Sequence, residues 1–143
     1  MQSLDLTPQD YELIEQAKDV IARLYRTDHH HVGAALRTSL GHVITAVHVE
    51  ANVGRITVCA EAMAIGKAIS EAEQTFETIV AVRRDDDDPN LFYVVSPCGM
   101  CRELINDYMP DGYVLCVENG ELKKVSASAV LPGKYTRDAR VIA

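Results

Sequence analysis

The chain has 143 residues, which suits one domain over residues 1–143, and 48% of them are hydrophobic, enough for an ordinary core. Its formal net charge of −7 disfavours a long nucleic acid as partner, because nucleic-acid-binding proteins usually present a basic face. No apolar run is long enough for a membrane span, and four cysteines without a secretory leader predict a reducing, cytoplasmic location with no membrane partner.

The predicted elements alternate between helices and strands. A first helix should begin after Thr7, the expected N-cap, with Pro8 at its first position. An alanine-rich helix follows Cys59, and Pro97 suits the first turn of a further helix. Strands are expected at 32–37, 43–50, 78–83, 91–95, 113–117 and 122–125, the last two forming a hairpin. The pattern predicts an α/β fold, a single three-layer domain with a central mixed sheet flanked by helices.

Two short segments carry the candidate chemistry: Cys59-Ala60-Glu61 and Pro97-Cys98-Gly99-Met100-Cys101. Three cysteine thiolates can hold a zinc ion and leave one position for water, whose pKa then falls from about 15.7 to about 7. Glu61, close to a ligand without being one, can move protons to and from that water. The helices would place all three cysteines near helix N-termini, where the helix dipole stabilises thiolates. The pattern is typical of zinc-dependent nucleobase deaminases.

Three other interpretations of the cysteines remain open. Cys98 and Cys101 could form a thioredoxin-like redox pair, which would leave the segment at Cys59 unexplained. Cys116 could complete a closed structural zinc site, but its apolar surroundings are typical of a buried strand and an inert core thiol. All four could also be buried core thiols. Two linked motifs favour catalytic zinc over each of these interpretations.

Over most of its length the chain resembles the cytidine deaminase family of small zinc-dependent nucleoside deaminases, which includes the blasticidin S deaminases. Besides the cysteine segments, the similar stretches are Val32-Gly33-Ala34-Ala35-Leu36 and Leu131-Pro132-Gly133-Lys134-Tyr135. The resemblance implies a homotetramer, with a dimer as the alternative, whose active sites are completed across subunits. It places Tyr135 in a neighbouring subunit's site, where its ring would stack on the base; a tyrosine packed within its own subunit is the alternative.

The same resemblance assigns roles to the residues of the two cysteine segments. Cys59, Cys98 and Cys101 are the implied ligands of Zn²⁺, and Glu61 is the implied proton shuttle. Many family members with three cysteines carry an arginine directly after the glutamate, which offsets the net negative charge of three thiolates on Zn²⁺. Here that residue is alanine, so another cation is expected to take over, and the candidates are Arg55, Arg102, Arg83 and Arg84.

The expected substrate contacts depart from the family pattern. Where the family has N-x-E for binding sugar hydroxyls, this chain has His48-Val49-Glu50. Glu50 can accept a hydrogen bond from a hydroxyl, and His48 can donate or accept in a different geometry from asparagine. His30 takes the place of an aromatic residue bordering the base pocket. The expected substrate-binding residues are His48, Glu50, Ala60, His30 and Tyr135.

A second metal site at the histidine run 29–31 is the less favoured interpretation of that segment. Adjacent side chains of an extended chain point in different directions, so they seldom chelate one ion together. A surface loop that titrates near the ordinary histidine pKa of about 6.5 is the expectation.

The sequence therefore predicts an enzyme, a zinc-dependent hydrolase that converts a free cytosine nucleoside, cytidine or deoxycytidine, to its uracil form and releases ammonia. Its expected partner is this small-molecule nucleoside. One alternative is a blasticidin S deaminase-like enzyme acting on a modified cytosine nucleoside. The other is a catalytically silent zinc protein that binds a nucleoside, although the intact Glu61 argues against it.

Overall fold

A six-stranded mixed sheet forms the centre of the molecule within residues 1–138 and 140–142, which the computed structural model describes. The strand order is β2-β1-β3-β5-β6, with β4 also paired to β3. β1 runs antiparallel to β2 and β3, β3 runs parallel to β5, and β5 and β6 form an antiparallel hairpin. The strands are β1 (Val32–Thr38), β2 (Val43–Val47), β3 (Phe76–Arg84), β4 (Phe92–Val95), β5 (Tyr113–Glu118) and β6 (Glu121–Ser126).

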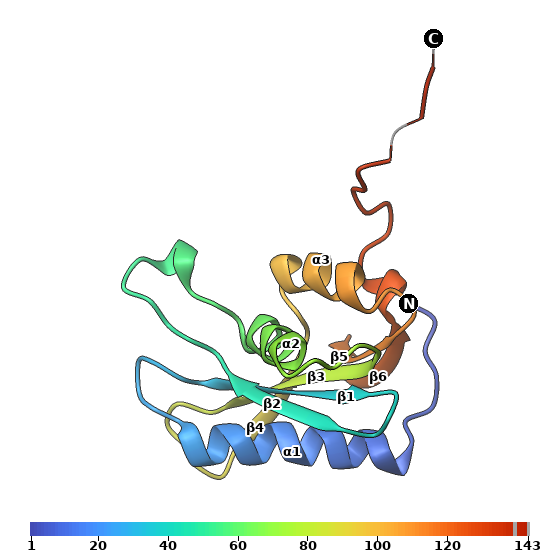
Figure 1. The fold of residues 1–143 in the computed structure, drawn as a ribbon. Coiled ribbons are helices and arrows are strands. Elements are labelled where there is room, and N and C mark those ends of the chain that lie inside the picture. The colour runs from blue at the N-terminus through green and yellow to red at the C-terminus, as the bar shows by residue number, and fades with distance from the viewer. Residues whose placement is uncertain (139, 143) are drawn as a thin grey trace.

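Helices cover both faces of this sheet, which gives the expected three layers (Figure 1). Helix α1 (Pro8–Leu24) lies on one face, and α2 (Ala60–Ser70) and α3 (Gly99–Tyr108) lie on the other. Alternate strand residues serve the two faces: Ala35 packs in the core beneath α1, whereas its neighbours in β1 pack beneath α2. No helix in the described part of the chain is both long and apolar enough to cross a membrane.

One edge of β3 is divided between two strands. Residues 78–80 of β3 pair with β5, and residues 81–84 pair with β4. Ser96, directly after β4, bridges the division, because its hydroxyl donates to the Val117 carbonyl at 2.8 Å and accepts the Val117 N–H at 3.0 Å. The chain leaves β4 at this division and enters α3, so the N-terminus of α3 lies where β4 and β5 diverge.

Local sequence signals explain most helix and turn boundaries. Thr7 caps α1 as predicted, and it forms a capping box with Asp10. The predicted hairpin between β5 and β6 turns through Asn119 and Gly120, whose φ angles are 53° and 79°. Gly33 is required where α1 crosses β1, because a Cβ there would lie 2.6 Å from a backbone oxygen of α1.

Two predicted boundaries were wrong. Helix α3 begins at Gly99 with Cys98 as its N-cap, so Pro97 precedes the helix. The reason is that the Pro97 carbonyl is used by the Arg102 side chain, and the first helical bond runs from the Arg102 N–H to the Cys98 carbonyl. Strand β2 ends at Val47, before the predicted end at residue 50. Beyond Val47 the predicted strand forms only an isolated bridge, at Val49.

After the 3₁₀ helix η2 (Ala127–Val130), the C-terminal segment runs away from the body of the molecule (Figure 1). Its base is tied to α3, because Lys134 pairs with Glu103 at 3.1 Å and Asp107 at 2.9 Å. Tyr135 follows this anchor and is 77% exposed. Its ring therefore lies free of the body of its own subunit.

Candidate metal centre and active site

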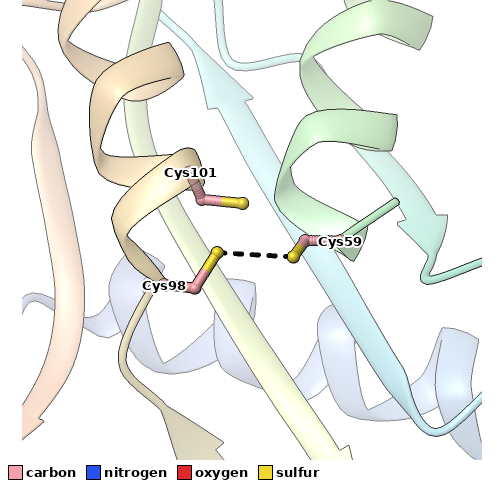
Figure 2. Close-up of side chains that lie close together, drawn as sticks. All are labelled: Cys59, Cys98 and Cys101. Atoms are coloured by element: carbon pink, nitrogen blue, oxygen red, sulfur yellow. Dashed lines mark hydrogen bonds between the residues drawn. The ribbon is translucent and has the colours of Figure 1, made fainter. Parts of the chain in front are cut away.

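Three cysteine sulfurs converge between the two helices on one face of the sheet (Figure 2). Cys59 is the N-cap of α2, Cys98 is the N-cap of α3, and Cys101 lies in the first turn of α3. The Sγ atoms of Cys59 and Cys98 are 3.4 Å apart, and all three sulfurs lie within 4.8 Å of one another. The prediction that these cysteines sit at helix N-termini is confirmed.

This spacing fits a zinc ion. Zinc–sulfur bonds of about 2.3 Å in tetrahedral geometry put ligand sulfurs about 3.8 Å apart. The Cys59–Cys98 separation of 3.4 Å and the 4.8 Å limit on all three separations are compatible with that value. Three cysteines fill three of the four tetrahedral positions and leave one for a reactant, as in catalytic rather than closed structural sites. Cys116 is buried in the middle of β5 and is absent from this sulfur cluster.

The thiols need a bound cation in order to become ligands. Burial raises the pKa of the Cys59 thiol to about 11 and raises the pKa of the Cys101 thiol further. Burial also raises the pKa of Cys98, but hydrogen bonds from the Cys101 backbone and from neighbouring thiols bring it below its usual value. Cation binding displaces such protons, and soft thiolates favour zinc over hard oxygen-seeking ions.

Glu61 lies in the first turn of α2, beside the sulfurs, and is only 6% exposed. The Cys101 thiol donates to its Oε2 atom at 3.7 Å. Burial raises the pKa of the Glu61 carboxyl. A raised pKa suits a carboxyl group that must both accept and give up a proton near neutral pH.

A cavity of about 170 Å³ lies against these groups. Sulfur atoms and the Glu61 carboxyl supply reactive groups on one side, and apolar side chains form much of the remaining wall. Its lining consists of Val32, His48, Cys59, Ala60, Glu61, Val95, Ser96 and Cys98. Such a cavity, mostly apolar with a few convergent polar groups, is typical of small-molecule sites.

The structure brings some of the predicted substrate residues to this cavity and not others. His48 and Ala60 line it. Glu50 lies beyond the lining and bonds to the His48 ring, and His30 bonds to the His48 carbonyl at 2.9 Å. Tyr135 belongs to the extended C-terminal segment, outside the lining of its own subunit's cavity.

Sequence reasoning missed part of the wall. Ser96 lines the cavity and bonds to β5, and its only sequence signal is its position directly before Pro97-Cys98. Val32 and Val95 also line the cavity, at one end of β1 and of β4. Apolar strand ends carry no pattern that separates a cavity wall from ordinary core, so these residues needed the fold to be found.

The arginine candidates for offsetting the thiolate charge are engaged elsewhere. Arg102 donates to the carbonyls of Pro97 and Val130. Arg83 pairs with Asp86, Arg84 stacks on Tyr25, and Arg55 is exposed on the surface. Among the described residues, none of these arginines is hydrogen-bonded to a cysteine sulfur. The positive ends of two helices therefore supply the favourable field at the sulfurs.

The three thiols, the buried carboxyl and the cavity beside them define a zinc-dependent hydrolase. Residues 7–117 match the model of the cytidine and deoxycytidylate deaminase zinc-binding region. The chain belongs to this family of zinc-dependent deaminases. The predicted fold class, enzyme class and zinc cofactor are therefore confirmed, whereas the individual ligand assignments stay predictions.

Two curated relatives illustrate the range of the family. The chain is 52% identical over 140 residues to blasticidin-S deaminase from Bacillus cereus, an alignment that covers 96% of this chain and 100% of the relative. It is 36% identical over 111 residues to a probable cytidine deaminase from Dictyostelium discoideum, covering 77% of this chain and 71% of the relative.

Solved structures agree with the fold. Cytidine deaminase from Burkholderia pseudomallei superposes with a TM-score of 0.71 at 28% identity, covering 91% of this chain and 100% of that one. The Bacillus anthracis cytidine deaminase gives a TM-score of 0.74 at 20% identity, covering 87% of this chain and 88% of that one, a likeness that concerns the fold alone.

Proposed function

We propose that the protein removes the exocyclic amine of the cytosine ring of a free nucleoside by hydrolysis and releases ammonia. The observation that carries this proposal is the buried Glu61 carboxyl, which lies beside a cluster of three sulfurs and lines one cavity together with Cys59 and Cys98. Cys59, Cys98 and Cys101 are the proposed zinc ligands. A silent nucleoside-binding protein would have no use for a buried carboxyl with a raised pKa.

The residues divide the reaction between them. When held by three thiolates, zinc supplies a water of lowered pKa as the attacking group. Glu61 accepts a proton from the attacking water at a carboxylate oxygen and passes it to the ring nitrogen. It then accepts the second proton, from the hydroxyl now bound to the ring carbon, and gives it to the departing amine. Val32, Val95 and Ala60 close the cavity around the ring and exclude bulk water. The balanced result is an amine replaced by a carbonyl, with water consumed and ammonia formed.

For the identity of the nucleoside we favour a modified cytosine nucleoside of the blasticidin S type. The support is the 52% identity to blasticidin-S deaminase, which extends over the full length of that relative. Cytidine or deoxycytidine is the second candidate. It is supported by Glu50, which matches the sugar-binding acid of the family, and by 30–36% identity to cytidine deaminases over about 110 residues.

The test is ammonia release by the zinc-loaded protein with blasticidin S, cytidine, 2′-deoxycytidine and free cytosine at equal concentrations. We expect turnover of at least one nucleoside, the highest kcat/KM for blasticidin S, and slow reaction of cytosine. A faster reaction with cytidine would select the second candidate. The absence of turnover with all four compounds would overturn the proposed activity. The Glu61→Gln variant serves as the blank.

We propose further that the protein is a homotetramer in which Tyr135 completes a neighbouring subunit's site. The support is the 77% exposure of Tyr135 on a segment that projects from the body while its base is tied to α3 by Lys134. Tyr135→Ala should raise KM about 5- to 150-fold and leave zinc content unchanged, because base stacking is worth about 1–3 kcal/mol. Light scattering measures the oligomeric state. A fully active monomer would contradict the role of Tyr135 in a neighbouring subunit's site.

A further inference from the structure

Both ring nitrogens of His48 are engaged, and their partners fix its tautomer. The backbone N–H of His31 donates to His48 Nδ1 at 3.2 Å. Because a backbone N–H can only donate, Nδ1 must be the unprotonated nitrogen. The ring hydrogen is therefore on Nε2, which donates to Glu50 Oε2 at 2.7 Å. No nitrogen of this ring is left for a substrate hydroxyl.

His48 is also held against rotation. The His31 ring stacks on it with ring centroids 4.8 Å apart and an angle of 22° between the planes. His30 Nδ1 bonds to the His48 carbonyl oxygen at 2.9 Å. The His48 side chain is only 10% exposed. Turning the ring toward a ligand would break two hydrogen bonds and a stacked contact at once.

Glu50, in contrast, keeps one oxygen accessible. Its Oε2 is bonded to His48, while its Oε1 has a 3.4 Å contact with the Thr57 hydroxyl. Its side chain is 38% exposed. The bridge between Val49 and Val58 places it beside the segment that leads into Cys59. The fixed carboxylate therefore lies next to the chain entering the metal centre, with acceptor capacity left over.

We propose that His48 is a positioning residue, which holds the Glu50 carboxylate so that it accepts a hydrogen bond from a donor on the sugar portion of the nucleoside. The proposal rests on the proposed function and deepens it. His48 closes the cavity wall with its ring, and Glu50 selects the sugar. Because an ionised carboxylate has acceptors only, the site favours sugars that present a hydroxyl or amino hydrogen there.

A metal ion shared by His31, His48 and Glu50 is the competing interpretation, since their ligand atoms lie within 4.8 Å of one another. The geometry disfavours it. Ring nitrogens bind metals through lone pairs in the ring plane, and two rings stacked at 22° direct those lone pairs side by side rather than to one point. His48 also has no unshared lone pair, because Nδ1 accepts from the His31 backbone.

A pair of substitutions separates the two hydrogen bonds of His48. In His48→Gln the amide nitrogen can occupy the place of Nε2 and still donate to Glu50. In His48→Asn the amide oxygen can occupy the place of Nδ1 and accept from His31, but the side chain is too short to reach Glu50. The matched control is His42→Asn, at the exposed His42–Glu73 pair, whose contact is 2.8 Å.

Kinetics are measured on the nucleoside that the wild type turns over and on free cytosine, which lacks the sugar. His48→Asn should raise KM for the nucleoside about 10- to 100-fold, the effect of losing one hydrogen bond to a charged group. The loss of kcat/KM should be much larger for the nucleoside than for free cytosine, because cytosine lacks the sugar that Glu50 would contact. His48→Gln should recover most of the loss. The double variant His48→Asn/Glu50→Gln should raise KM for the nucleoside no further than Glu50→Gln alone.

Several results would overturn the proposal. Equal losses in His48→Asn and His48→Gln would show a structural role, and additive losses in the double variant would show a separate substrate contact. A second zinc per subunit that disappears in His48→Gln would establish the shared metal. Nitrogen NMR of the His48 ring reads the tautomer without turnover, and a hydrogen on Nδ1 would refute the proposal even if every tested nucleoside failed to react.

Discussion

Two polar clusters, each with a buried acid, lie toward opposite ends of β1, and they differ in whether their charges are matched. Toward the Arg37 end, Asp10 of α1 bonds to Arg37 at 2.8 Å and to Lys124 of β6 at 2.9 Å. Toward the Val32 end, three thiols and Glu61 meet with no cationic side chain bonded to them in the described part of the chain. Arg37 also pairs with Glu77 at 2.8 Å, so the first cluster matches two acids with two cations, whereas the second requires a cation from solution.

The pKa values of Asp10 and Glu61 reflect this difference between the two clusters. Burial tends to raise the pKa of Asp10, but the Thr7 N–H, Arg37 and Lys124 together lower it from 3.8 to about 2. Burial raises the pKa of Glu61, and its weaker hydrogen bonds do not reverse the shift. A buried acid with matched partners joins elements of the fold, whereas a buried acid without them is available for proton transfer.

The largest effect is expected from removing a thiol. Cys98→Ser should lose zinc and activity together, with a large loss of stability, since zinc binding contributes about 10–16 kcal/mol in small zinc domains. Cys116→Ser should keep both zinc and activity, because Cys116 is buried in β5 away from the cluster. Metal analysis decides: zinc retained by Cys98→Ser and lost by Cys116→Ser would reverse the assignment.

Glu61→Gln tests whether Glu61, the buried acid without a cationic partner among the described residues, transfers protons in the reaction. Gln keeps the shape of the side chain but cannot transfer protons, so kcat should fall about 10²- to 10⁴-fold or further. Zinc content should stay near wild type, and the melting temperature should not drop, because a buried acid without a cationic partner contributes little to folding. A near-native kcat in this variant would remove Glu61 from the mechanism.

Asp10→Asn should give the opposite result. Lys124 would lose its carboxylate while Arg37 keeps its pair with Glu77. The change should therefore cost about 3 kcal/mol of unfolding free energy, while kcat/KM stays within about twofold of wild type. Glu15→Gln is the control in the same helix, because its pair with Lys18 is exposed and 3.9 Å long. A drop in activity without a drop in stability would mean that the first cluster is also functional.

The smallest expected effect is the pH dependence of the stability difference between wild type and Asp10→Asn. Because the pKa of Asp10 is lowered to about 2 in the folded state, its stabilisation is complete above an unfolded-state pKa of about 4 and is lost as the pH falls through about 2. The stability gap between wild type and Asp10→Asn should therefore shrink by about 2 kcal/mol across this window. Zinc release in acid affects both proteins, so denaturant unfolding of the pair isolates Asp10.

Sequence reasoning succeeded where the signal was local. The capping box at Thr7, the turn at Asn119-Gly120 and the cysteines at two helix N-termini each depend on a few neighbouring residues. The sulfur cluster was also predictable, since two linked motifs fix both the ligand type and the helical ends that present it.

The rest depended on particular side-chain contacts that no sequence pattern describes. The hydrogen bond between Asp10 and Lys124 joins residues 114 positions apart, and no local sequence pattern near either residue predicts it. The helix start near Pro97 was misplaced because the Pro97 carbonyl is bound by the Arg102 side chain, five residues further on, a contact that helix propensity does not describe. His48 and Glu50 were predicted to face one pocket, but their bond to each other required the observed side-chain directions.

The division of one edge of β3 between β4 and β5 has an evolutionary consequence. The chain leaves the sheet at this division, so the metal loop is located by main-chain pairing, with Ser96 bridging the two strands. Ser96 of this junction also lines the cavity, but Val32, His48 and Ala60 line it from other points on the fold and take no part in the junction. Substitution of those side chains can change which nucleoside binds while the junction stays in place. Related proteins can therefore differ in substrate specificity and keep the same metal site.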